Sequence, residues 1–250
     1  MNISIKLPLF CYETSKRKNN EDYIFPIPGT ATDTNRLFIV CDGMGGHEDG
    51  EIASKTATEA ISEYWSIHPQ QPDDAGKVIH AITAAISKMD QMVADFKVDE
   101  SMGTTMTLAS IGTESILVAH VGDSRIYQIR PGLGIIYQSK DHSQVQEWVD
   151  KGLLTPEEAR IHPCSNIITQ VIQPQGLAFI NPEVVVLNDI EDGDYLFLCT
   201  DGITESIDDQ LLVEIISSPV SNHEKMNGIK QICLENSRDN HSAYLIPLIK

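Results

Sequence analysis

Two apolar segments, each followed by Asp-Gly, decide the fold: Leu37-Phe38-Ile39-Val40-Cys41 precedes Asp42-Gly43, and Tyr195-Leu196-Phe197-Leu198-Cys199-Thr200 precedes Asp201-Gly202. A short, continuous apolar run bounded by a turn signal is typical of a buried strand. Each segment therefore predicts a buried strand that carries a carboxylate at its end. Taken singly, an Asp-Gly pair is better explained as a turn, because this dipeptide is common in turns.

Other short β-like runs indicate that these two strands belong to antiparallel sheets. Connections such as Gly112-Thr113-Glu114 and Gly122-Asp123-Ser124 are too short for the crossover that parallel strands require. We therefore predict largely antiparallel sheets. The predicted strands are Leu37–Cys41, Thr104–Ser110, Ser115–Val121, Arg125–Arg130, Glu183–Leu187, Tyr195–Thr200 and Ser242–Ile249.

Helical periodicity occurs in two blocks of the chain. Apolar residues recur at three- and four-residue spacing from Ile52 to Tyr64 and again from Val78 to Val93, where Asp73 or Asp74 is suited to cap the helix. The second block covers 210–217 and 223–236, before the last predicted strand. Helices grouped in two blocks around many strands favour a layered α+β fold over an alternating parallel one.

A polar interval between Lys140 and Gln175 interrupts this pattern. It contains a helix-like stretch, Ser143 to Asp150, and a helix start at Thr155-Pro156-Glu157-Glu158. We interpret the interval as an inserted flap. Since no repeat or linker is evident, we predict one domain over residues 1–250, with the flap at about 140–175.

The charge balance excludes two classes of partner. The 250 residues include 36 acidic and 18 basic side chains, which gives a formal net charge of -18. Nucleic-acid phosphates and anionic lipids both require clustered positive charge, so neither nucleic acid nor membrane is an expected partner. Hydrophobic residues make up 41% of the chain, enough for a sizeable core.

The cysteines and the lengths of the apolar runs bear on the cellular location of the protein. The five cysteines are widely spaced and form no Cys-x-x-Cys pair, so neither a disulfide framework nor a zinc knuckle is suggested. No signal-peptide pattern is visible, and no apolar run reaches the ~18 residues that a membrane span requires. We therefore expect a cytoplasmic protein.

Further aspartates indicate what the two Asp-Gly pairs do. Asp22 leads into a strand-like segment, Asp123 lies in a tight turn, and Asp239 precedes the final strand. Carboxylates at several strand ends, without a matching cysteine or histidine cluster, favour an oxygen-ligand site for Mg²⁺ or Mn²⁺ over zinc. Two such ions about 3.5–4 Å apart can share a water and support phosphoryl transfer. Arg17, whose guanidinium can hold two phosphate oxygens, is the candidate substrate-binding cation.

A series of motifs carries a family resemblance. In chain order they are Arg17-Lys18-Asn19-Asn20-Glu21-Asp22, Val40-Cys41-Asp42-Gly43-Met44-Gly45-Gly46-His47, Gly103-Thr104-Thr105, Val121-Gly122-Asp123-Ser124-Arg125, Thr200-Asp201-Gly202 and Asp239-Asn240. This series resembles the metal-dependent protein serine/threonine phosphatases of type 2C, and the flap motif Asp141-His142-Ser143 resembles their bacterial branch. The resemblance implies a four-layer α/β/β/α sandwich, in which two antiparallel sheets lie between helix layers.

The resemblance also implies a metal-ligand set. Asp42 would bridge two Mn²⁺ or Mg²⁺ ions, and the backbone carbonyl of Gly43 would bind one of them. Asp22, Asp201 and Asp239 would supply the remaining protein oxygens, directly or through water. A water bridging the two ions would then attack the phosphorus of phosphoserine or phosphothreonine.

The remaining roles implied by the resemblance surround this centre. Asp123, with Asp201, matches a third-metal site of bacterial relatives. Arg17 would bind the substrate phosphate, while Glu21 and Asn240 would lie in the outer shell, where Glu21 orients a water. The expected partners are phosphoserine and phosphothreonine proteins, together with a cognate serine/threonine kinase.

Two departures from the family pattern bear on mechanism. Met44 stands where eukaryotic relatives have a histidine that is argued to protonate the leaving group, and nearby His47 is assigned no acid role. In the flap, Thr169-Gln170-Val171-Ile172-Gln173 replaces the usual Thr-Arg-(Ala)-Leu-Gly. This second change makes substrate choice an open question and leaves the metal chemistry intact.

Two alternative functions remain open at this level. One is a metal-dependent phosphatase of small molecules, and the other is a catalytically silent regulator that binds phosphoproteins. Every expected carboxylate is present, which argues against the silent regulator.

Overall fold

The two apolar segments form strands of two different sheets in the computed structural model, which describes residues 2–45, 49–71, 73–96, 99–176 and 180–250. The first segment lies in β4 (Leu37–Met44), and the second is β11 (Tyr195–Cys199). Both strands have neighbours on each side, and every strand pair is antiparallel. The prediction of antiparallel sheets is confirmed.

Each sheet has six strands, and we call them sheet I and sheet II. Sheet I has the order β10 (Glu183–Leu187), β7 (Ile116–Val121), β6 (Met106–Ile111), β4 and β3 (Asp22–Phe25), with β5 (Gly103–Thr104) also paired to β4. Sheet II has the order β1 (Ser4–Ile5), β12 (His241–Ile249), β11, β8 (Arg125–Arg130) and β9 (Gly134–Gln138), with β2 (Leu9–Glu13) also paired to β12.

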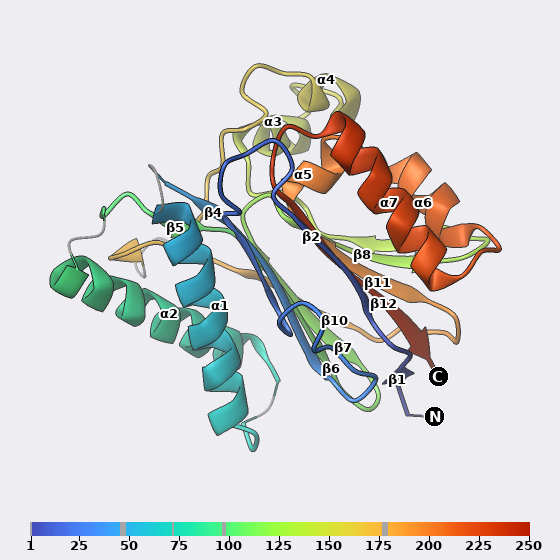
Figure 1. Ribbon diagram of the computed structural model, residues 1–250, viewed down its shortest axis with the longest axis horizontal. Coiled ribbons are helices and arrows are strands. Elements are labelled where there is room, and N and C mark those ends of the chain that lie inside the picture. Colours follow the sequence, from blue (N-terminus) through green and yellow to red (C-terminus); the bar gives the residue numbers. More distant parts are fainter. Residues whose placement is uncertain (1, 46–48, 72, 97–98, 177–179) are drawn as a thin grey trace.

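The helices form the two outer layers (Figure 1). Helices α1 (Asp49–Ile67) and α2 (Ala75–Phe96) pack on the outer face of sheet I. Helices α6 (Asp209–Ser217) and α7 (Asn222–Asn236) pack on the outer face of sheet II. The short helix α5 (Asp201–Thr204) follows β11, while α3 (Gln144–Asp150) and α4 (Pro156–Arg160) lie in the predicted flap segment.

Alternating side chains of β4 fill two separate cores. Phe38 and Val40 point between the sheets, whereas Ile39 and Cys41 pack under α1 and α2. All four are fully buried. Since burying one large apolar side chain contributes about 1.5–3 kcal/mol, a strand with two buried faces is held firmly in register. The four-layer sandwich predicted from the sequence is thereby confirmed.

The helix caps follow the sequence signals. The Asp74 carboxylate accepts a hydrogen bond of 2.9 Å from the Lys77 N–H at the start of α2. Thr155 and Glu158 form a reciprocal capping box at the start of α4. Across the ranges described, no helix is long and apolar enough to span a membrane.

The structure corrects several strand predictions. Three strands were not predicted, namely β1, β2 and β9. β1 spans only two residues, and the apolar run in β9, Ile135 to Tyr137, is shorter than the four residues that indicate a strand. β2 was missed although Leu9 to Tyr12 is a continuous apolar run. The predicted strand 104–110 divides at Thr105, because the Asp42 N–H donates to the Thr105 hydroxyl in place of a backbone carbonyl.

Candidate metal centre and phosphate site

The first Asp-Gly pair continues a strand. Asp42 lies within β4 and is the register partner of Asp22 on β3. Its N–H donates to the Thr105 hydroxyl at 3.0 Å, and its carbonyl accepts from the Thr105 N–H at 2.9 Å and the Thr104 hydroxyl at 2.8 Å. These bonds fix the backbone of Asp42, and its carboxylate takes no part in them. The turn explanation for Asp42-Gly43 is therefore wrong.

The second Asp-Gly pair begins a helix. Asp201 is the first residue of α5, and its carbonyl accepts from the Glu205 N–H at 2.8 Å. The turn explanation is wrong here as well. Asp201 follows a strand of sheet II, whereas Asp42 lies in a strand of sheet I. The two sheets thus each contribute one of these carboxylates.

Both glycines of the pairs allow a close backbone approach. A Cβ on Gly43 would lie 1.9 Å from the Gly50 carbonyl oxygen and 2.6 Å from that of Glu21. A Cβ on Gly202 would lie 1.9 Å from the Asn240 carbonyl oxygen. Side chains cannot be accommodated at such distances. The glycines therefore bring the start of α1 and the start of β12 against the two aspartates.

Asp22 joins the two sheets through a hydroxyl. One of its carboxylate oxygens accepts a 3.1 Å hydrogen bond from Thr200, whose hydroxyl in turn accepts from the Ser242 N–H at 3.0 Å. The side chain of Asp22 is almost completely buried, and its other oxygen, Oδ1, has no hydrogen-bond partner. A buried carboxylate oxygen without a partner is costly unless a cation satisfies it.

Two further aspartates also have a buried carboxylate oxygen that forms no hydrogen bond. The Oδ1 atoms of Asp123 and Asp201 are also buried without a hydrogen-bond partner. Asp123 lies in the turn between β7 and β8. The three orphaned carboxylate oxygens come from different chain segments, and carboxylate oxygen is the ligand type that hard divalent cations prefer. The residues present therefore fit the predicted Mg²⁺ or Mn²⁺ site.

Burial, together with the charges of neighbouring carboxylates, raises the pKa of these groups. Burial, followed by the charge of Asp201, raises the pKa of Asp123 to about 8, and burial likewise raises that of Asp22 to about 8. Burial and the neighbouring Asp201, Asp22 and Asp123 carboxylates raise the pKa of Asp42 well above its ordinary value. Without cations, the cluster therefore retains protons near neutral pH.

Asp239 faces Arg17 rather than the other carboxylates. A guanidinium nitrogen of Arg17 lies 2.5 Å from the Asp239 carboxylate, and the two side chains are 54% and 28% exposed. Within the described part of the chain, these aspartates do not bring three carboxylate oxygens within 4.8 Å of one another. The set is thus spread more widely than the ligands of a single ion.

Asn240 holds the segment that carries Arg17. Its side-chain oxygen accepts from the Glu21 N–H at 2.8 Å, and its amide donates to the carbonyls of Thr14 and Asn19 at 2.8 and 2.9 Å. Burial raises the pKa of the half-buried Glu21 carboxyl, although Arg17 partly opposes this effect. Asn240 therefore fixes the chain on both sides of Arg17.

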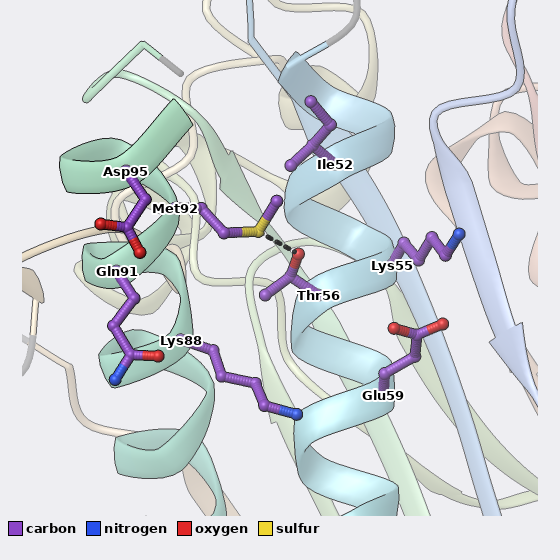
Figure 2. Close-up of a pocket in the computed structure, with 8 residues that line it drawn as sticks. All are labelled: Ile52, Lys55, Thr56, Glu59, Lys88, Gln91, Met92 and Asp95. Carbon is purple, nitrogen blue, oxygen red and sulfur yellow. Dashed lines mark hydrogen bonds between the residues drawn. The ribbon is translucent and has the colours of Figure 1, made fainter. Parts of the chain in front are cut away.

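Met44 and a groove between two helices lie outside the aspartate cluster. Met44 ends β4 and is half-exposed, while Gly46 and His47 lie outside the described residues. A groove of about 440 Å³ lies between α1 and α2, where Thr56 and Met92 make a 3.1 Å contact (Figure 2). None of the predicted site residues lines it.

Sequence reasoning missed the hydroxyls that position the aspartates. Thr105 and Thr200 bond the backbone of Asp42 and the side chain of Asp22, respectively, and Thr105 also bonds the Ser124 hydroxyl at 2.7 Å. Each threonine belongs to one of the sequence motifs quoted above, so the sequence did single out both residues. It gave neither threonine a role.

Two antiparallel sheets between helix layers, with buried aspartates from both sheets beside an arginine, have the architecture of a metal-dependent phosphatase. The family model described as protein phosphatase 2C matches residues 13–232, and the chain belongs to this family. The predicted family and the prediction of a phosphatase enzyme are thereby confirmed.

Relatives and solved structures agree with this assignment. The chain is 36% identical over 208 residues to protein phosphatase PhpP of Streptococcus pneumoniae, covering 82% of this chain and 81% of the relative. A crystal structure of the Mycobacterium tuberculosis serine/threonine phosphatase PstP/Ppp superposes with a TM-score of 0.84 at 28% identity, covering 99% and 100% of the two chains. A structure of the PstP catalytic domain in complex with two manganese ions gives 0.81 at 26% identity, with the same coverage.

Proposed function

We propose that this phosphatase hydrolyses phosphoserine and phosphothreonine in proteins with the help of two divalent cations. The observation that carries the proposal is the group of three buried, unpartnered oxygens on Asp22, Asp123 and Asp201. The serine/threonine phosphatases among its relatives support the choice of substrate. The proposed unit is one catalytic domain over residues 1–250, with the flap at about 140–175.

We assign the cation ligands as the sequence predicted them. Asp42, the Gly43 carbonyl, Asp22, Asp201 and Asp239 would hold two Mn²⁺ or Mg²⁺ ions, and Asp123 with Asp201 would hold a third. When bound, the ions would lower the pKa of a water shared between them, so that it attacks phosphorus, and would offset the negative charge of the transition state.

The cations supply what this cluster lacks. Each carboxylate is desolvated and repels the others, as the raised pKa values of Asp22 and Asp123 indicate. Positive charge among them favours the ionised carboxylates and makes the site attractive to a phosphate dianion. The same residues without cations would repel that substrate.

Arg17 is the proposed phosphate-binding residue, and its present partner suggests how it is held until substrate arrives. The guanidinium is half-exposed and bonded to Asp239. If Asp239 turns toward the cation site, Arg17 gains free donors for two phosphate oxygens. Asn240 keeps the Arg17 segment in place meanwhile, and Glu21 is placed to orient a water at the edge of the site.

Partners and location are proposed on separate grounds. Phosphoproteins and a cognate serine/threonine kinase are the expected partners of such an enzyme. All five cysteines are unpaired, and four of them are buried. Free thiols persist in reducing compartments, which supports a location in the cytoplasm.

The test compares Mn²⁺-dependent phosphate release from phosphoserine and phosphothreonine peptides, nucleotides and sugar phosphates. Faster release from the peptides is expected. Asp42→Asn should abolish release, while Asp33→Asn, at an exposed loop aspartate, should leave it unchanged. Preference for nucleotides or sugar phosphates would replace the protein substrate by a small molecule. No release from any substrate would indicate a silent regulator.

A further inference from the structure

Three side chains outside the aspartate cluster form a compact group that the phosphatase reaction does not use. His120 on β7 and Glu183 on β10 are register partners in sheet I, and His142 lies at the beginning of the flap segment. One ligand atom from each residue lies within 4.8 Å of the other two. This spacing is met by no other trio of histidine, cysteine or acidic side chains in the part of the chain that the structure describes.

His120 carries an unused lone pair in the interior. Its ring is completely buried, and Nε2 lies 2.7 Å from the Lys140 carbonyl oxygen. Because a carbonyl only accepts hydrogen bonds, Nε2 carries the proton and Nδ1 carries the lone pair. Nδ1 is buried and has no hydrogen-bond partner. Zinc-binding histidines commonly donate their second N–H to a backbone carbonyl in this way.

His142 presents a second neutral ring beside the first. The two rings are stacked, with centroids 4.5 Å apart. Nδ1 of His142 accepts a 3.2 Å hydrogen bond from the Gly122 N–H, so a cation that binds this lone pair would replace that bond. Burial and the neighbouring His120 lower the pKa of His142 to about 4, so the ring is neutral at physiological pH.

Glu183 supplies the negative charge. It is half-buried, and its carboxylate makes no hydrogen bond or ion pair among the residues that the structure describes. Two neutral imidazoles and one carboxylate match the ligand set of zinc sites that have three protein ligands and a water in the fourth position. Mg²⁺ and Mn²⁺ prefer oxygen ligands, so the two sites differ in chemistry.

We propose that His120, His142 and Glu183 form a zinc site that fastens the beginning of the flap to sheet I. The neighbouring contacts connect this site to the catalytic region. Asp141 binds Arg125 through two hydrogen bonds of 2.7 Å, and the His142 N–H donates to the Gly122 carbonyl at 2.8 Å. Gly122 precedes Asp123, so zinc would hold the flap at a fixed position relative to that aspartate.

The test measures Zn²⁺ binding directly. The full chain is stripped of metal, supplied with excess Mg²⁺ to occupy the aspartates, and titrated with Zn²⁺ against a chromophoric chelator. Glu183→Gln and His142→Gln should each weaken one binding event at least about tenfold. His80→Gln, at an exposed histidine of α2, should bind Zn²⁺ as the wild type does.

A second comparison separates this site from the proposed phosphatase centre. Asp42→Asn should retain the event that Glu183→Gln loses, whether or not the phosphatase proposal holds. Zn²⁺ should also raise the melting temperature of the wild type and fail to raise that of either folded variant. Equal Zn²⁺ affinity in the wild type, Glu183→Gln and His142→Gln would overturn the proposal, as would loss of the same event in Asp42→Asn.

Discussion

Asp22 and Asp42 stand directly opposite one another on the adjacent strands β3 and β4. Like charges at opposed positions of a sheet destabilise it. The pair is tolerated because protons, and in the proposed working enzyme cations, offset the repulsion. This relationship makes the stability of the protein depend on pH and on divalent metal.

The metal-free protein should lose stability as the pH rises from about 4 to about 8. The folded-state pKa values of Asp22 and Asp123, both about 8, exceed their ordinary value of 3.8. The folded state therefore holds protons that the unfolded chain has released, and the free energy of unfolding falls across this window. Urea denaturation in a chelator at pH 5 and pH 8 measures the change, and Mn²⁺ should restore stability at pH 8. A flat profile would contradict the raised pKa values.

Asp42→Asn should reduce Mn²⁺-supported phosphate release at least about a hundredfold, because it removes the carboxylate proposed to bridge the ions. The metal-free variant should be at least as stable as the wild type at pH 8, since it lacks one of the mutually repelling carboxyl groups. Steady-state kinetics and thermal unfolding measure both effects. Near-normal activity would exclude the proposed role of Asp42.

Arg17→Ala should lower kcat/KM by about 10- to 100-fold, because a charge-assisted hydrogen bond to phosphate contributes roughly 1.5–3 kcal/mol. Lys18→Ala is the matched control, since Lys18 is an exposed cation in the same segment. It should change kcat/KM little beyond a small, salt-sensitive effect. Equal losses in the two variants would point to general electrostatic attraction instead of a specific contact.

Gly43→Ala should destabilise the protein by several kcal/mol, because its Cβ would meet the Gly50 carbonyl oxygen at 1.9 Å. Gly228→Ala is the control: it lies within α7, and nothing lies within 4 Å of its added Cβ. That variant should be neutral or more stable by up to about 1 kcal/mol. Chemical denaturation of both variants at one pH, with and without Mn²⁺, provides the comparison.

The strands were predictable where hydrophobic pattern alone determines them. Leu37–Cys41 and Tyr195–Cys199 are continuous apolar runs, and both form buried strands. β9 was not found in this way, because its apolar run, Ile135 to Tyr137, is only three residues long and the strand depends on pairing with β8. The turn explanation of the two Asp-Gly pairs also failed because it considered only local sequence. Gly43 and Gly202 are needed because the Gly50 and Asn240 carbonyl oxygens approach them closely in the folded structure.

The sequence predicted which aspartates belong to the site, but it did not predict which residues they contact. The aspartates were named from their positions at predicted strand ends. Their partners depend on tertiary structure: Thr200 bonds Asp22 across 178 positions, and Arg17 meets Asp239 across 222. Likewise, the pairing of His120 with Glu183 follows from the register of β7 and β10, which no local pattern specifies.

The Thr200 hydroxyl, placed between Asp22 of one sheet and the Ser242 N–H of the other, has a consequence for folding. Neither sheet alone contains the whole set of carboxylates, so a partly folded chain lacks the centre even if one half is already native. Cation binding therefore reports on the docking of the two sheets. We expect high-affinity Mn²⁺ uptake during refolding to coincide with the last cooperative step, which makes catalytic competence a late property of the molecule.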